Sequence, residues 1–334
     1  MDYGHKMTEQ ELLKLQREIS ALYSKEYAEV QREINSFLRE YAREYKTKRL
    51  ELQQGIITKD QFRNWQIGKV SQNEKFERLR IFFAERMVNA RVETMKAAER
   101  IAYIVFSLNY NYTSYELELL GYDLVKTIYD NGKVFELVDE HTIKRLLKKN
   151  PSLLPKPSAN KVKEYEWNKK KISTEVTDGI LRGEPVKKVA ARIKGVTEMD
   201  SRAALRAART AVTGAQNSGR QESYNNAAEN GIRVRKRWIA AKDTRTRESH
   251  ALLDGQIVDF DKPFQSAYGD IRYPADPTAH AGDIWNCRCT MATAERADLE
   301  IEPRKMRVYN PETGESEVID KLSYTEWVRR IEQL

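Results

Sequence analysis

Cysteine and histidine are both scarce, since the 334 residues include only 2 Cys and 4 His. The cysteines, Cys287 and Cys289, are separated by one residue, so a disulfide between them would close a very small ring with unfavourable geometry. We therefore expect reduced thiols, which serve either as metal ligands or as small buried side chains. Reduced thiols also indicate a protein that matures in the cytoplasm.

Long apolar runs are absent as well. No stretch approaches the roughly 20 residues that a membrane-spanning helix requires. Residues 1–8 lack the apolar segment and the small-residue cleavage site of a signal peptide. The composition, 40% hydrophobic and 32% charged, is typical of a soluble protein. We expect no membrane partner and no secretion by a signal peptide.

Three common catalytic signatures are also missing: a glycine-rich phosphate loop, a Gly-x-Ser-x-Gly elbow and a His-Glu-x-x-His helix. Their absence weakens the case for the corresponding enzyme classes. The sequence does have an excess of positive charge, with a formal net charge of +8 and a pI near 9.2. This excess favours an acidic partner such as nucleic acid or an acidic protein face, although a merely soluble basic surface fits it equally well.

The N-terminal half shows the period of long amphipathic helices. Apolar residues recur mostly at three- and four-residue steps from Leu12 to Tyr45, after a predicted capping box at residues 8–11. One small domain cannot cover so long a helix. Its apolar stripe is therefore expected to pack on a second long helix, predicted over about 72–106, or on a partner chain.

Shorter elements are predicted around these two helices. Thr58 or Asp60 can cap a short helix that extends to Trp65. Residues 109–113 are rich in turn formers and aromatic side chains and are predicted as a loop, with helices continuing to residue 149. The N-terminal part is thus expected to be elongated and mainly helical, with a long helical hairpin.

Proline then marks a boundary, because three prolines within residues 151–158 require extended backbone. Beyond it the sequence predicts, in order, helices at 167–181, 185–193 and 201–228, a strand at 234–239, short strands and loops to about 292, a hairpin around 310–314 and a final helix opened by a capping box at 323–326.

The expected fold class is α+β, in which the mainly helical part is followed by a helical segment and a small domain rich in strands and loops. Four sequential parts are predicted: a helical N-terminal domain at 1–150, a proline-rich linker at 151–160, a central domain at 161–299 and a C-terminal hairpin and helix at 300–334.

Four metal-capable side chains fall in one polar, turn-rich stretch: His250, His280, Cys287 and Cys289. The stretch has no helical or strand-like apolar period, so something other than an amphipathic core must stabilise it. These four side chains can complete a tetrahedral Zn²⁺ shell, which would be structural because no coordination position stays open. The spacing follows no standard zinc pattern. Buried cysteines beside hydrogen-bonded loop histidines are the alternative.

The densest basic segment lies just before this stretch and contains one tryptophan, Trp238. It can follow a phosphate backbone, or it can be a solvated strand face paired with nearby carboxylates. The candidate nucleic-acid-binding residues are Arg233, Arg235, Lys236, Arg237, Lys242, Arg245 and Arg247.

Four aspartates in the same region, Asp243, Asp254, Asp276 and Asp283, permit a hydrolytic interpretation. A metal-dependent nuclease with His250 as general base would use such carboxylates. Aspartate beside glycine or proline is also the ordinary turn former, and we expect the structural role.

Several of these residues stand in an order that resembles the phage minor head proteins related to protein F of phage Mu. The resemblance covers roughly residues 165–295 and includes Ala208–Arg220, an Arg-Trp pair, an Asp-x-Arg-x-Arg-x-x-His run and Asn-Cys-Arg-Cys. The positions typical of the family are Arg209, Trp238, Asp243, Arg245, His250, Asn286, Cys287 and Cys289. The His-Pro that usually precedes the final motif is absent, and His280 lies farther upstream.

The resemblance implies a low-copy virion protein that is associated with the portal inside the head and assembled in the host cytoplasm. It implies a part in head assembly, and in DNA packaging or ejection through nonspecific binding of double-stranded DNA. The expected partners are the portal protein, the major capsid and scaffolding proteins, and DNA. Our first hypothesis is therefore a non-enzymatic minor capsid protein. A DNA-processing nuclease is the second hypothesis, and a toxin-like effector is the third, because similar domains also occur joined to toxin modules.

Overall fold

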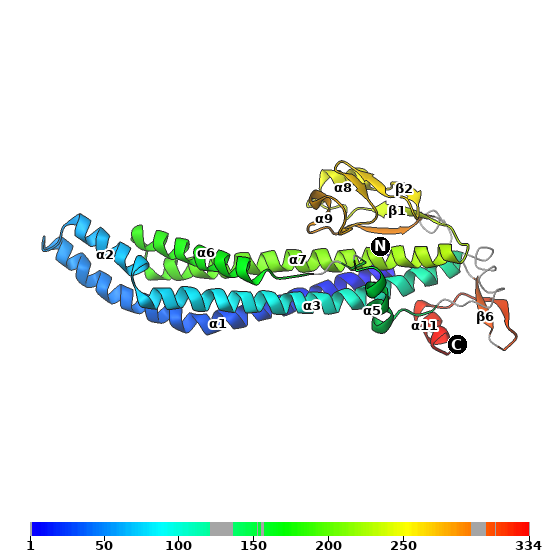
Figure 1. Cartoon of the computed structure of the whole chain (residues 1–334), viewed down its shortest axis with the longest axis horizontal. Coiled ribbons are helices and arrows are strands. Elements are labelled where there is room, and N and C mark those ends of the chain that lie inside the picture. Colours follow the sequence, from blue (N-terminus) through cyan, green and yellow to red (C-terminus); the bar gives the residue numbers. More distant parts are fainter. Residues whose placement is uncertain are drawn as a thin grey trace. The chain divides into compact units, whose positions relative to one another are not determined.

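The computed structural model describes residues 2–120, 136–151, 153–154, 157–294, 305–310 and 312–333 (Figure 1). The chain divides into two compact units. Unit 1 comprises residues 1–15, 98–157 and 206–334, and unit 2 comprises residues 16–97 and 158–205. Each unit combines segments from both sides of the proline-rich stretch, and the four sequential domains stay a prediction.

Long helices dominate the chain, and the short strands are confined to its C-terminal region. The helices are α1 Tyr3–Gln53, α2 Lys59–Ser71, α3 Glu74–Leu120, α5 Glu140–Lys149, α6 Lys161–Leu181, α7 Val186–Glu229, α8 Glu248–Leu253, α9 Ala281–Ile284 and α11 Tyr324–Gln333. The strands are β1 Arg235–Ile239, β2 Ile257–Asp259, β3 Phe264–Ser266, β4 Gly269–Ile271, β5 Thr290–Thr293, β6 Lys305–Asn310 and β7 Glu315–Asp320. The α+β class is confirmed. None of the described helices combines the length and apolarity that a bilayer crossing requires.

Unit 2 contains the predicted helical hairpin. The rings of Phe37 on α1 and Phe76 on α3 stack at 5.1 Å, and Tyr41 stacks on Trp65 of α2 at 5.7 Å. Thr58 forms the capping box of α2, which extends to Ser71 and is therefore longer than expected. Because aromatic side chains of α1 and α2 stack on each other, the short helix packs against the hairpin rather than forming a loose connection.

Two boundaries predicted for the long helices were wrong. The helix α1 begins at Tyr3, so Thr8 lies inside it and donates to the Gly4 carbonyl instead of capping the helix. Residues 109–113 belong to α3 and form no loop. The buried Asn109 amide donates to Thr8 Oγ1 and to the Val105 carbonyl, so tertiary packing satisfies a side chain that by itself favours turns.

The helix α7 is continuous where the sequence predicted a break near Asp200. The Asp200 carboxylate is buried, lies 3.8 Å from Arg91 Nη1 and accepts from the Asn168 amide. Burial raises its pKa to about 6. A buried and partnered carboxylate does not need the N-cap position, so the helix continues through it. The predicted helix before residue 149 is found as α5, whereas residues 121–135 lie outside the described part of the chain.

Unit 1 contains the strands. A three-stranded antiparallel sheet has the order β2-β1-β5, and β3-β4 and β6-β7 form two separate hairpins. The predicted strand near 234–239 and the hairpin around 310–314 are confirmed. So is the capping box of α11, in which Ser323 and Glu326 exchange hydrogen bonds. Trp238 at the centre of the sheet and Trp327 on α11 are completely buried in the core of this unit.

Candidate metal centre

Three metal-capable side chains converge in unit 1. His250 on α8 and the two cysteines just before β5 are all buried, and their ligand atoms lie within 4.8 Å of one another. Nδ1 of His250 is 3.6 Å from Cys287 Sγ and 3.4 Å from Cys289 Sγ. In a tetrahedral zinc site with usual bond lengths, such nitrogen–sulfur pairs are about 3.6 Å apart. The donor set and its spacing therefore fit a metal ion.

The Asn-Cys-Arg-Cys segment turns sharply at Asn286, whose φ of +57° lies in the left-handed region. Asparagine tolerates this conformation better than most residues. Two residues of α7 stabilise the turn. Arg209 donates to the Asn286 side-chain oxygen at 3.0 Å, and the backbone N–H of Asn286 donates to Thr210 Oγ1 at 2.8 Å. The turn lets two cysteines that are one residue apart direct both sulfurs to the same point.

The helix α7 also fixes the backbone of both cysteines. Thr213 Oγ1 donates to the Cys287 carbonyl at 2.9 Å, and the side-chain amide of Asn217 donates to the Cys289 carbonyl at 3.2 Å. The Asn217 oxygen accepts from the amide of Met291 in β5 at 3.1 Å. The polar residues of this part of the helix therefore have a positioning role.

The two thiols share their hydrogen bonding unequally. A hydrogen bond from Cys287 lowers the pKa of Cys289 to about 5, against the effect of burial and with help from His250. The same hydrogen bond, together with burial, raises the pKa of Cys287. The site thus stabilises negative charge on one sulfur, and thiolate is the form that binds metal.

The other side of the His250 ring faces a carboxylate. Nε2 lies 3.4 Å from Oδ1 of the buried Asp283 and 3.4 Å from Nη1 of Arg247. Ser266 donates to the second oxygen of Asp283. Trp238 packs edge-on against the imidazole, with the ring centroids 5.4 Å apart. A carboxylate beside Nε2 favours the tautomer that leaves Nδ1 free to bind a metal.

His280, the fourth predicted ligand, lies elsewhere. It is exposed, it stacks on Tyr268 with 4.9 Å between ring centroids, and its Nδ1 accepts from the Gly282 amide. Among the described residues, the group that can hold a metal consists of His250, Cys287 and Cys289. Three protein ligands leave a fourth position for water or another group, which differs from the closed shell expected from the sequence.

The predicted nucleic-acid-binding residues do not form one exposed surface. Lys236 is buried and donates from Nζ to Gln221 and to the Arg272 carbonyl. Lys242 is paired with Asp254 at 2.9 Å, and Arg247 donates to the Asp283 carbonyl at 3.1 Å. Of the others, Arg233, Arg235 and Arg245 are exposed and Arg237 is half-buried. Residues 231–294 contain ten lysines and arginines against eight acidic residues, so this region is only weakly basic.

Three of the four aspartates act in local structure. Asp243 accepts from the Arg245 amide and pairs with Arg288. Asp254 accepts from the Ala240 backbone amide, and Asp276 accepts from Arg272 and Thr278. These contacts agree with the turn-forming role, and only Asp283 lies next to His250. Its place beside the histidine was not expected, because only the fold brings α8 and α9 together.

The residues that carry the family resemblance meet around this centre. Arg209 contacts Asn286, and Trp238 packs on His250. Asp243 contacts Arg288, which lies between the two cysteines, and it also accepts from Arg245. Positions up to 80 residues apart therefore build one site. The pairing of Arg288 had no signal in the sequence beyond its place inside the motif.

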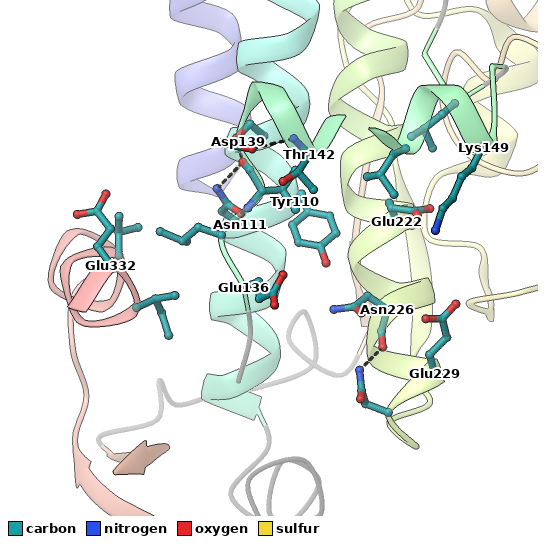
Figure 2. Close-up of a pocket in the computed structure, with 18 of the residues that line it drawn as sticks. Tyr110, Asn111, Glu136, Asp139, Thr142, Lys149, Glu222, Asn226, Glu229 and Glu332 are labelled. Carbon is teal, nitrogen blue, oxygen red and sulfur yellow. Dashed lines mark hydrogen bonds between the residues drawn. The ribbon is translucent and has the colours of Figure 1, made fainter. Parts of the chain in front are cut away.

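Unit 1 also contains a pocket of about 1550 Å³ that shares no lining residue with this centre (Figure 2). Glu222 and Glu229 of α7, Glu136 and Glu332 line it together with a single lysine, Lys149. Burial raises the pKa of Glu222. An acidic lining repels phosphate, so this pocket is not a candidate nucleic-acid interface.

Comparison with known proteins gives one family match. Residues 170–292 match the family described as Phage Mu protein F like protein. This segment contains the three metal-capable residues, the strands β1 to β4 and most of β5. No solved structure matches the chain significantly.

Two curated relatives match segments of this chain that are similar in length to each other. The minor head protein GP7 of Bacillus phage SPP1 is 32% identical over 159 residues, which is 48% of this chain and 50% of that protein. A protein of Enterococcus faecalis named as an NAD(+)–arginine ADP-ribosyltransferase is 32% identical over 157 residues, which is 47% of this chain and 30% of that protein. The matches thus span half or less of each of these relatives.

Proposed function

We propose that the chain is a non-enzymatic minor head protein that acts in head morphogenesis and resides in the virion, because residues 170–292 match the family described as Phage Mu protein F like protein. The convergence of the family-typical residues on one buried centre carries this proposal. The likeness to a phage minor head protein supports it. In this proposal the chain associates with the portal inside the head, is present in few copies, and contacts the major capsid and scaffolding proteins during assembly in the host cytoplasm.

Particle fractionation tests this proposal. Virions of a phage that encodes the chain are purified, emptied of DNA and probed with an antibody against the chain. In a second experiment, a tagged copy of the chain is tested for co-purification with the portal protein. We expect the chain in the head fraction and on the portal, and we expect defective heads when its gene is silenced. Normal heads that lack the chain would overturn the proposal.

We propose further that the centre binds a structural Zn²⁺ through His250, Cys287 and Cys289. The Nδ1–Sγ distances, the burial of all three side chains and the stabilised Cys289 thiolate support this choice of metal. The ion would cross-link α8 to the segment before β5. No reaction step is assigned to it.

Metal analysis tests the zinc proposal. We expect one Zn²⁺ per chain in the purified protein, and we expect none after Cys287 and Cys289 are both changed to serine. The same double variant should have a lower melting temperature than wild type. Treatment of wild type with a chelator should lower its melting temperature toward that of the variant. Metal-free wild-type protein with an unchanged melting curve in the variant contradicts a structural ion.

A metal-dependent nuclease is the alternative function. One observation favours it, namely the open fourth position of a three-ligand site beside the buried carboxylate of Asp283. Cleavage of DNA with Mg²⁺ or Mn²⁺ by wild type, lost in His250→Ala, would support this alternative. The activity in the name of the Enterococcus relative is not carried over, because the match covers 30% of that protein.

A further inference from the structure

Two short segments of this chain carry a strong excess of positive charge. Residues 46–70 and 182–194 contain eleven lysines and arginines but only three acidic residues. Their combined excess is eight positive charges. The β-rich region 231–294 has an excess of only two.

The two basic segments lie together within unit 2. The first comprises the end of α1 and nearly all of α2, and the second comprises the turn between α6 and α7 and the start of α7 (Figure 1). The Gln66 amide on α2 donates to the Ile180 carbonyl at the end of α6 at 2.8 Å. Gly183, which follows α6, lies close to Tyr45 of α1, since a Cβ atom added at Gly183 would be 3.5 Å from the Tyr45 hydroxyl oxygen. We call this part of unit 2, residues 46–70 and 182–194, the basic end.

Many of the cations at the basic end are exposed and have no carboxylate partner. Five of the eleven are in ion pairs: Lys48, Lys69, Arg182, Arg192 and Lys194. Six others are exposed and have no ion-pair partner within the described part of the chain: Lys46, Arg49, Lys59, Arg63, Lys187 and Lys188. Lys59 and Arg63 are four residues apart and lie on the same face of α2. Cations that are not already neutralised give the largest release of counterions on a polyanion.

We propose that the basic end binds the phosphate backbone of double-stranded DNA, without sequence preference. The inference rests on the proposed minor head function and on the nonspecific DNA binding expected from the sequence, and it moves the contact away from residues 233–247. A duplex offers closely and regularly spaced negative charge, which suits long flexible side chains from the two segments. Exposed apolar residues are also present, since Ile56 is 66% and Leu50 54% exposed. They do not carry the binding, because phosphate contacts need only the cations.

The experiment compares two matched variants of the full chain. The first removes four charges at the basic end, with Lys59→Gln, Arg63→Gln, Lys187→Gln and Lys188→Gln. The second removes four in the β-rich region, with Arg233→Gln, Arg235→Gln, Lys242→Gln and Arg245→Gln. Binding to a short duplex of mixed sequence is measured by fluorescence anisotropy over a series of NaCl concentrations. Melting curves confirm that both variants are folded.

For the basic-end variant we expect the slope of log K against log [NaCl] to become shallower by roughly 0.9 per lost contact, or about 3.6 for four. The β-rich variant should keep most of the wild-type slope, and Ile56→Ser should leave the affinity unchanged. Full binding by the basic-end variant overturns this inference alone. No duplex binding by wild type overturns the DNA role itself. Tighter binding of wild type to anionic phosphatidylserine vesicles, lost in Ile56→Ser, would replace DNA with a membrane surface.

Discussion

Nε2 of His250 lies 3.4 Å from Oδ1 of Asp283, and both side chains are almost completely buried. That carboxylate oxygen has no hydrogen-bond partner within the described part of the chain. A buried carboxylate oxygen without a partner is costly, so this contact is expected to tighten when the imidazole is oriented by a metal on Nδ1.

The first prediction concerns this pair. Asp283→Asn should weaken Zn²⁺ binding by roughly 10–100-fold, because loss of the carboxylate removes the group that orients His250 and increases its basicity. Affinity is measured by competition with a chromophoric chelator. Asp270→Asn is the matched control, since Asp270 is an exposed aspartate of β4 in the same region. Equal affinities in both variants would show that Asp283 does not position the ligand.

The second prediction concerns Lys236, whose ammonium group is buried beneath the sheet. Burial lowers its pKa to about 7 from the usual 10.5. Between these values the unfolded chain binds a proton that the folded chain lacks, so stability increases as pH rises through this window. Lys236→Met removes the titrating group.

The free energy of unfolding is measured with urea at pH 7 and near pH 10 to check this. Wild type should gain stability relative to Lys236→Met as the pH is raised. Lys262→Met is the control, because Lys262 has a side chain that is 66% exposed and should not alter the pH dependence. Parallel pH profiles for wild type and Lys236→Met would contradict the prediction.

The third prediction has the opposite sign. Glu118 of α3 accepts a hydrogen bond from Trp327 Nε1 of α11, and burial raises its pKa to about 8. Between pH 4.5 and 8 the folded chain holds a proton that the unfolded chain has lost, so stability falls as pH rises. Glu118→Gln keeps an acceptor oxygen for Trp327 and should remove this loss. Thermal melts at pH 5 and 8 test it, with Glu93→Gln on the exposed side of α3 as control.

Some elements of the fold could be predicted from the sequence alone and others could not. The period of apolar residues correctly predicted the helical hairpin, the strand β1 and the α+β class, because these patterns are local. The same alternation placed Lys236 and Trp238 on one face of the strand, but it did not identify that face as the buried one. Lys236 was therefore expected on a surface. Burial is a tertiary property, and a single strand does not reveal it.

The candidate site was predictable only in part for the same reason. His250, Cys287 and Cys289 could be selected because metal-capable residues are rare in this chain. The position of Asp283 beside His250 could not be predicted. The four aspartates all stand in turn-like sequence contexts, and only the folded arrangement of α8 and α9 distinguishes Asp283 from the other three. The continuity of α7 through Asp200 also depended on Arg91, a residue more than 100 positions away.

The last prediction uses two glycines of α7 that look alike in the sequence. Gly219 packs directly on the backbone of α3, where an added Cβ would lie 2.5 Å from the Phe106 carbonyl oxygen. Gly195, on the same helix, has nothing within 4 Å of an added Cβ. In a helix, alanine is more stable than glycine by roughly 0.8–1 kcal/mol when nothing opposes it.

Gly195→Ala should therefore stabilise the protein by up to about 1 kcal/mol. Gly219→Ala should destabilise it by about 1–3 kcal/mol, because two helix backbones must separate to admit the methyl group and the propensity gain offsets only part of that cost. Urea unfolding of both variants at one pH gives the comparison directly. A stabilising Gly219→Ala would mean that α3 and α7 are not in backbone contact at Phe106, and a destabilising Gly195→Ala would mean that this face of α7 is covered by a partner.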